Sequence, residues 1–354
     1  LKSDVGYYKF KTSSFTNISI TSNQISLNNI TLFTPPTPSL ATWFTWDGTK
    51  ITGLTDLGKQ QSRFVIPEFT TSIESEAFIN NVNITYFDAS FSRLSSLKSQ
   101  VFYGCSNLKE VKLTNTLLSI GNGVFEKCKN LVKIDIPDSV RSIGTGAFSQ
   151  CSNLSSINIP KIDIIPTHML SYCTSLKSVT IPTSVTNINS WAFARSSLTS
   201  VIIPDNVLSI ANDAFNYCVY LTDVKLPNKL TLLESQTFMN CNALSSINIP
   251  DTITTIKNSV FTNCSLLDNI TLPSSLRSIG SYAFSGCTSL TSITIPNSVN
   301  AIGTLVFNMD LSSISKPNPN LVVYVNSNSV ETLIKNVFSG TVINLSKNRM
   351  KYII

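Results

Sequence analysis

Cysteine and histidine are the residues of this 354-residue chain with the most versatile chemistry, and it contains eight cysteines and one histidine. A thiol can act as a nucleophile, a zinc ligand or a disulfide partner, and an imidazole can act as a base or a metal ligand. Zinc sites need closely spaced ligands such as Cys-x-x-Cys, which the chain lacks. The single His168 leaves Ser-His-Asp and Cys-His catalysis almost without a base, and we expect it to be a surface-loop residue. The sequence therefore predicts no catalytic residue, no metal site and no cofactor.

The spacing of the cysteines reveals an internal repeat. Successive cysteines are 23, 23, 22, 45, 23, 23 and 23 residues apart, and the interval of 45 is one unit of 23 plus one of 22 with Ser196 at the missing position. A phenylalanine, or Leu170 in one unit, precedes each of these positions by three residues, and a proline follows most of them by nine. Phe78 and Phe307 extend the same register at both ends. The cysteines are Cys105, Cys128, Cys151, Cys173, Cys218, Cys241, Cys264 and Cys287.

One unit, CKNLVKIDIPDSVRSIGTGAFSQ from Cys128, contains the elements that the repeat requires. Apolar and polar residues alternate before the proline, which is the period of a half-buried strand. A second apolar pair, Val140 and Ile143, predicts a short extended or turn-like segment, and the Ala-Phe segment after it predicts a tight helical turn. A unit this short cannot bury its own apolar face, so stability must come from stacked units. The repeat therefore predicts an α/β solenoid with a parallel sheet.

Stacking also determines the role of the cysteines. Equivalent positions of successive units lie in one column, so the eight side chains point the same way into the core, where a free thiol behaves as a small hydrophobic group. Parallel side chains match the geometry of a disulfide poorly. We therefore predict a ladder of buried free thiols, in which Ser196 costs only packing.

Three parts of the chain depart from the repeat. The segments KIDIIPTHMLSYC and SWAFARSSL each lack one residue, and they carry Leu170 in place of Phe and Ser196 in place of Cys. The region between Phe78 and Phe102 is irregular and only loosely similar to the other units. We expect these departures to change curvature or loops locally and to leave the architecture intact.

The unit resembles the short leucine-rich repeat of the BspA-like class, on the strength of F-x-x-C-x-x-L-x-x-[IV]-x-[IL]-P and S-[VL]-x-x-I-G over residues 63–311. The resemblance implies a right-handed superhelix with a concave parallel sheet and with short helical turns or short strands on the convex side. It also implies a surface or secreted protein of a bacterium or parasitic protist, often an adhesin for host cells or matrix.

We expect three parts along the chain. Residues 1–62 form a β-rich cap, with strands in FTNISITSNQISLNNITLF and with Trp43 and Trp46 packed over the first unit. Residues 63–311 form the array of about ten repeats. Residues 312–354 form a C-terminal cap, in which a strand precedes a helix over 330–338 that Ser329 caps.

Two columns of polar residues line the exposed concave face if the strand alternation is right. Charges gather at the N-terminal end and in the Asp223 and Lys225 unit, and hydroxyl and amide groups fill the rest. Such a face suits broad protein or glycan contact, although Ser, Thr and Asn are also what any solvated sheet tolerates. The columns hold no aromatic residue, which disfavours a stacked sugar. The candidate partner-binding residues are Glu110, Lys112, Lys133, Asp135, Asn158, Thr180, Asp223, Lys225, Asn248, Thr271 and Thr294.

The composition excludes two classes of partner. Lys and Arg number 26 and Asp and Glu number 20, so the net charge of +6 is dilute, and only 13% of residues are charged. Basic and acidic residues alternate, so the electrostatic footprint of nucleic-acid binding is missing. No apolar stretch approaches the roughly 18 residues of a membrane-spanning helix. The first residues, LKSDVGYYKFK, are polar, so we expect any signal or anchor sequence to lie outside this chain.

We predict a non-enzymatic, monomeric module that acts at the cell surface or outside the cell and binds a protein ligand of a host cell or matrix. Two alternatives stay open. A structural or scaffold repeat protein with an intracellular partner would equally permit reduced, buried thiols. A glycan-binding module would need aromatic side chains in an ordered pocket near Trp43 or Trp46.

Overall fold

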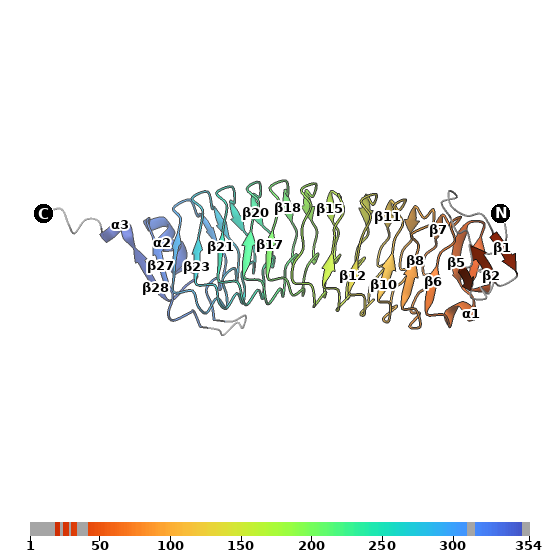
Figure 1. Cartoon of the computed structure of the whole chain (residues 1–354). Coiled ribbons are helices and arrows are strands. Elements are labelled where there is room, and N and C mark those ends of the chain that lie inside the picture. Colours follow the sequence, from red (N-terminus) through yellow and green to blue (C-terminus); the bar gives the residue numbers. More distant parts are fainter. Residues whose placement is uncertain (1–17, 22–23, 28–29, 34–41, 310–315, 349–354) are drawn as a thin grey trace.

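The computed structural model describes residues 18–21, 24–27, 30–33, 42–309 and 316–348. It shows an elongated solenoid of parallel strands with about 13 turns (Figure 1), which confirms the predicted architecture. Strands of neighbouring turns pair in register, as Ile134 does with Ile157. The repeat length therefore sets the register of the whole molecule.

The first strand series comes from the alternating residues before the proline. In most of the three-residue strands the central apolar residue is buried and its neighbours are exposed, as Val201 is between Ser200 and Ile202; the exception is the strand at Phe87, where Tyr86 is buried as well. The series consists of β6 (Arg63–Val65), β8 (Tyr86–Asp88), β10 (Glu110–Lys112), β12 (Lys133–Ile134), β14 (Ser156–Ile157), β17 (Ser200–Ile202), β19 (Asp223–Lys225), β21 (Ser246–Asn248), β23 (Asn269–Thr271), β25 (Ser292–Ile295), β27 (Val322–Val325) and β28 (Thr341–Asn344).

The second strand series comes from the second apolar pair of each unit. Most of its members are two residues long, and they pair in parallel along the opposite edge of the solenoid in Figure 1. The series consists of β5 (Lys50–Leu54), β7 (Ser72–Ile73), β9 (Ser96–Leu97), β11 (Ser119–Ile120), β13 (Ser142–Ile143), β15 (Ile164–Ile165), β16 (Asn187–Ile188), β18 (Ser209–Ile210), β20 (Leu232–Leu233), β22 (Thr255–Ile256), β24 (Ser278–Ile279) and β26 (Ala301–Ile302).

The F-x-x-C segments form a third side, which we call the turn side. They are tight turns, but between Lys59 and Asn328 the described chain contains no α-helix. Two residues of nearly every turn have positive φ, such as Asp213 at 61° and Tyr217 at 58°. This backbone directs alternate N–H groups to the next turn, so Tyr217 N donates to the Met239 carbonyl at 2.8 Å. Bonds between turns thus alternate with bonds inside each tight turn, such as that from Cys218 N to the Phe215 carbonyl at 3.2 Å.

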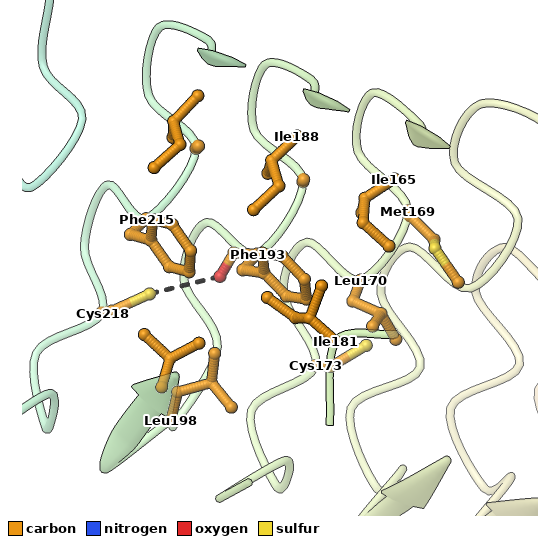
Figure 2. Packing of buried hydrophobic residues seen from close by; sticks show 14 of the residues in the cluster. Ile165, Met169, Leu170, Cys173, Ile181, Ile188, Phe193, Leu198, Phe215 and Cys218 are labelled. Atoms are coloured by element: carbon orange, nitrogen blue, oxygen red, sulfur yellow. Dashed lines mark hydrogen bonds between the residues drawn. The ribbon is translucent and has the colours of Figure 1, made fainter. Parts of the chain in front are cut away.

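The core is a stack of identical side chains. Phenylalanine rings of successive turns lie nearly parallel, with 5.6 Å between the centroids of Phe215 and Phe238 and an interplanar angle of 11°. The stack is interrupted at Leu170, and Figure 2 shows Leu170 beside Phe193 in the position of the missing ring, with Met169 on the far side of Leu170. Leu170 and Met169 are fully buried, so the departure from the repeat is accommodated by packing.

The N-terminal part adds antiparallel strands. Strands β1 (Ile18–Thr21), β2 (Gln24–Leu27) and β3 (Ile30–Phe33) form one sheet, as the alternation predicted. Strand β4 (Phe44–Asp47) pairs with β5, which then pairs in parallel with β7, and helix α1 (Asp56–Lys59) follows β5. The ladder of the second strand series thus continues into this N-terminal hairpin.

The C-terminal part contains β27, helix α2 (Asn328–Lys335), β28 and helix α3 (Leu345–Asn348). The prediction of a strand followed by a helix is right, but the prediction of Ser329 as the cap is wrong. Ser327 has the extended backbone of an N-cap, with φ −144° and ψ 154°, and its Oγ accepts a hydrogen bond from Val330 N at 3.2 Å. Ser329 instead lies within the first turn of the helix.

Candidate functional site

The exposed residues of the first strand series form a continuous polar surface, which we call the strand face. Because side chains alternate along a strand, the residues on either side of each buried apolar residue point to solvent. Every candidate residue is exposed there: Glu110, Lys112, Lys133, Asp135, Asn158, Thr180, Asp223, Lys225, Asn248, Thr271 and Thr294. Thr180 is in a unit that contributes no strand to the first series, so this sheet is interrupted between β14 and β17.

The charged residues at the N-terminal end of the strand face neutralise one another. Lys133 Nζ lies 3.0 Å from an Asp135 oxygen, and Lys112 Nζ lies 3.5 Å from a Glu110 oxygen. Exposed pairs of this kind contribute little to stability, roughly 0–1 kcal/mol. Because these four side chains are paired with one another, their charges are less available for ion pairs with a binding partner.

Three further residues extend this charged end, and the sequence analysis missed them. Arg63 lies over the ring of Tyr86 at 3.9 Å, and the Tyr86 hydroxyl donates to Asp88 at 2.7 Å. Lys112 also approaches Asp88, at 3.9 Å. Tyr86 and Asp88 are not among the predicted residues because the sequence indicates an irregular unit after Phe78, whereas β8 pairs in register with both β6 and β10.

At this end of the strand face, the carboxyl group of Asp88 has a shifted pKa. Burial alone would raise its pKa, but hydrogen bonds from Ser90 and Tyr86 and the charge of Lys112 outweigh burial, so the pKa of Asp88 is lowered. Asp88 is therefore a fixed anion within an ion-pair network, which is unsuited to proton transfer near neutral pH.

Asn158 is exposed but engaged with the neighbouring turn. Its Oδ1 accepts from Ile136 N at 2.7 Å, and its Nδ2 donates to the Ile136 carbonyl at 2.7 Å. The amide thus replaces strand hydrogen bonds between β12 and β14. A structural role explains Asn158 without a ligand.

A hollow of about 470 Å³ lies on the strand face between β19 and β21, with Asp223, Lys225, Asn228, Ser246 and Asn248 among its lining residues. In the described part of the chain, neither Asp223 nor Lys225 forms an ion pair with any other residue. Ile202 of β17 is paired in register with Lys225, and its exposed side chain adds an apolar group on the other side of β19 from the hollow. Free charges of both signs, amides and an apolar edge therefore meet at one place.

The C-terminal half of the strand face is neutral. Thr271 and Thr294 continue the column, which then reaches Tyr324 of β27 through its pairing with Thr294. The predicted columns contain no aromatic residue; beyond them, strand pairing places the buried Tyr86 at one end and the half-buried Tyr324 at the other.

The predicted thiol ladder is confirmed: all eight cysteines are free and buried. Burial raises the pKa of Cys105 and Cys173 to about 12, against a backbone hydrogen bond that lowers it. A protonated, buried thiol is neither a nucleophile nor a metal ligand. Among the residues that the structure describes, no cluster of three His, Cys, Asp or Glu side chains is placed to hold a metal ion.

Trp43 and Trp46 pack against the core. The Trp43 ring meets Phe64 edge-on at 6.0 Å, and the Trp46 ring lies 5.6 Å from Phe44 and 5.4 Å from Phe69. A hollow of about 360 Å³ near the N-terminal end is lined by other residues, including Lys59, Glu76 and Asn81. The structure therefore favours packing as the role of both tryptophans.

Comparison with known proteins agrees with this architecture. The sequence profile of the BspA type leucine rich repeat region, which comprises six copies, matches residues 71–199 and 186–314. No curated protein matches the chain. In the described part of the chain, no helix has the length and apolar character needed to cross a membrane.

Several solved structures share the fold. A leucine-rich repeat protein of Bacteroides ovatus matches with a TM-score of 0.62 at 21% identity, over 95% of this chain and 100% of that one. A leucine rich cell surface protein of Faecalibacterium prausnitzii matches with a TM-score of 0.56 at 23% identity, over 94% and 96%. The pneumococcal vaccine antigen PcpA matches with a TM-score of 0.50 at 17% identity, over 92% and 88%.

At these identities the structural likeness shows the fold, and the profile match, which spans more than half of the chain, shows the family. The chain belongs to the BspA-type leucine-rich repeat family.

Proposed function

We propose that this chain is a non-enzymatic binding or adhesion module of a microbial surface protein, and that it engages a protein ligand of a host cell or matrix through the strand face. One observation carries the proposal: Asp223 and Lys225 keep unpaired charges of opposite sign at the hollow beside Ile202. The charges farther along the same face, from Glu110 to Asp135, are already paired with one another.

The physical basis is complementarity. A stable protein interface combines a water-excluding centre with matched charges, and unpaired charges steer association and fix register. The exposed side chain of Ile202 supplies apolar surface next to Lys225, and the flanking Ser, Thr and Asn side chains supply hydrogen bonds. The surface location is supported by the fold shared with the cell surface protein of Faecalibacterium prausnitzii.

A solid-phase assay tests the proposal with a matched pair of variants. The chain is presented to immobilised host matrix proteins and to host cells, and bound chain is quantified. Lys225→Glu reverses a charge at the hollow, and Arg277→Glu reverses an exposed charge beside β24 of the second strand series. We expect Lys225→Glu to weaken binding about tenfold or more, and Arg277→Glu to bind like the unchanged chain.

Two results would count against the proposal. Absence of binding to every matrix protein and cell type would remove the adhesion role. Equal binding by Lys225→Glu and the unchanged chain would remove the hollow on the strand face as the contact surface.

A further inference from the structure

The turn side carries a second group of chemically distinctive residues, far from the strand face in the cross-section of the solenoid. They occupy two positions of each turn, the fifth residue before the cysteine position and the residue directly before it. We call them the aromatic–arginine cluster, and they are His168, Tyr172, Trp191, Arg195 and Tyr217.

The side chains of the cluster stack along the solenoid. The guanidinium carbon of Arg195 lies 4.0 Å from the ring centroid of Tyr217 and 5.3 Å from that of Tyr172. The rings of His168 and Trp191 lie 5.8 Å apart with an interplanar angle of 22°. The ring faces that point toward each other within the cluster are therefore covered by the neighbouring side chain. Tyr172 and Tyr217 are still 40% and 38% exposed. Solvent reaches mainly ring edges and polar ends.

The charge of Arg195 is not compensated. In the described part of the chain its side chain forms no ion pair or hydrogen bond, and its Nε is buried without a partner. Of the three guanidinium nitrogens, only Nε is buried without a partner, and the two terminal nitrogens reach solvent. Because this guanidinium is stacked and partly desolvated before any ligand arrives, it loses less conformational entropy when it binds an anion in a forked geometry.

Two acids lie near the cluster without neutralising Arg195. Asp213 is buried and accepts a hydrogen bond from Asn216 at 2.6 Å. Glu126 lies close enough to His168 for their charges to interact. Neither carboxylate comes within ion-pair distance of Arg195.

The backbone conformation shows that these residues are not the choice that stabilises a turn best. Arg195, Tyr172 and Trp191 have φ of 58°, 59° and 59°, and His168 and Tyr217 have 56° and 58°. The left-handed region is unfavourable for large side chains and is preferred by Gly and Asn. Other turns use Gly or Asn at six of these positions, namely Gly104, Gly123, Gly146, Asn240, Asn263 and Gly286, and use larger residues such as Gln100, Lys127, Gln150 and Tyr282 at others.

The cluster coincides with the departures from the repeat. Leu170 lies between His168 and Tyr172 in the chain, and Ser196 directly follows Arg195. The core of these turns has been rebuilt, as Figure 2 shows at Leu170 and Met169, while their outer side carries the cluster.

We propose that the aromatic–arginine cluster is a second binding surface, and that its ligand is a carboxylate side chain in an acidic segment of a partner protein. The Arg195 guanidinium can donate two N–H groups to one carboxylate, and the hydroxyls of Tyr172 and Tyr217 add donors beside it. Arg, Tyr and Trp are the residues that dominate protein interfaces. A neutral sugar would stack on ring faces, which are here largely taken up by neighbouring groups.

A titration with labelled peptides tests this proposal on the whole chain. The probes are a short peptide of alternating Glu and Ser and a matched peptide of alternating Gln and Ser, followed by fluorescence anisotropy at low and high salt. Arg195→Asn is the test variant, because Asn240 and Asn263 occupy the equivalent position in other turns. Lys127→Asn is the control, because Lys127 occupies the same position and lies 4.6 Å from the Tyr103 ring.

We expect the Glu peptide to bind the unchanged chain and Lys127→Asn alike, to bind Arg195→Asn about tenfold more weakly, and to lose affinity as salt rises. The Gln peptide is expected not to bind. Tyr217→Phe keeps the ring beside Arg195 and removes one hydroxyl, so it is expected to fold and to weaken binding by a smaller factor.

Three outcomes would overturn the proposal. They are equal binding of the Glu peptide by Arg195→Asn and the unchanged chain, no binding up to about 1 mM peptide, and Arg195-dependent binding of polygalacturonate in place of the peptide. Lys225→Glu is expected to leave this titration unchanged, so failure here is separable from failure of the strand-face proposal.

Discussion

Each cysteine of the array donates a hydrogen bond from its thiol to the carbonyl of a phenylalanine in the preceding turn. The distance is 3.0 Å from Cys151 Sγ to the Phe125 carbonyl and 3.2 Å from Cys218 Sγ to the Phe193 carbonyl, the bond drawn in Figure 2. Ser196 contacts the next cysteine position of the column, since its Oγ lies 3.4 Å from Cys218 Sγ. A small donor at this position links the turns, which is why one unit can use Ser.

We predict that the eight thiols of the folded chain do not react with iodoacetamide at neutral pH. Burial raises the pKa of Cys287 to about 12 and that of Cys128 well above its usual range, and the thiolate is the reactive form. Mass spectrometry should show unmodified protein before unfolding and eight modifications after unfolding in denaturant without a reductant. Rapid native alkylation, or fewer than eight modifications after unfolding, would contradict the free-thiol ladder.

We predict that Phe215→Ala lowers the free energy of unfolding by about 3–5 kcal/mol, because it removes a buried ring between Phe193 and Phe238 and leaves a cavity. Leu208→Ala removes an exposed side chain of the same unit and should change stability by at most about 0.5 kcal/mol. Urea unfolding followed by circular dichroism measures both. Equal effects of the two substitutions would show that the ring stack does not hold the turns together.

At the scale of the elements, the periodic strands could be predicted and the turns could not. Alternation with period two fixes which side of a strand is buried, so the exposure of Asp223 and Lys225 followed from their neighbours alone. The turn side depends on left-handed residues, and the sequence does not show that Tyr217 adopts such a conformation. Bonds between turns decide that geometry, and they involve residues one repeat apart.

The candidate site divides in the same way. Spacing placed every candidate residue on the strand face, but it could not show that Lys133 pairs with Asp135 or that Asn158 bonds to the neighbouring turn. Those facts depend on side-chain conformations across neighbouring turns. The aromatic–arginine cluster was missed because its positions look like loop. The signal that could have found it is an arginine among aromatic residues at equivalent positions of three successive turns.

The C-terminal part is held by one carboxylate. Glu331 of α2 accepts hydrogen bonds from Asn344 Nδ2 at 2.6 Å, Lys335 Nζ at 2.7 Å and Lys347 Nζ at 2.6 Å. The hydrogen bond from Asn344, with those from the two lysines, lowers the pKa of Glu331 to about 2. This carboxylate therefore ties α2 to β28 and α3.

We predict that acid loosens this part of the molecule. Because the folded pKa lies below the ordinary value of about 4.3, the stabilisation is complete above that pH and is lost as pH falls toward about 2. Hydrogen exchange of α2 amides should accelerate over that range in excess of the intrinsic rate. Glu331→Gln should show fast exchange already at neutral pH, whereas Asp251→Asn, at an exposed carboxylate in the array, should not. Slow exchange of α2 in Glu331→Gln would contradict the role of the carboxylate.

At the scale of the whole molecule, stacking explains how a chain with few charges presents so much polar surface. Hydroxyl and amide side chains bond to the preceding turn, as Ser275 does to the Ile253 carbonyl at 2.7 Å and Asn130 does to Asn107 at 3.2 Å. These polar ladders repeat along the solenoid, and charged residues are interspersed among them. The charges proposed for binding are those of Asp223 and Lys225 at the hollow and of Arg195 on the turn side.

The central claim is that a protein partner binds across the strand face. Hydroxyl-radical footprinting of the chain alone and in complex with a matrix protein captured by the solid-phase assay measures this directly. Ile202 on the strand face and Leu208 beside β18 report on two sides of one unit, since their side chains are 66% and 56% exposed. The account predicts that the complex protects Ile202 from oxidation and leaves Leu208 unchanged. Protection of Leu208 with Ile202 still open to oxidation would contradict it.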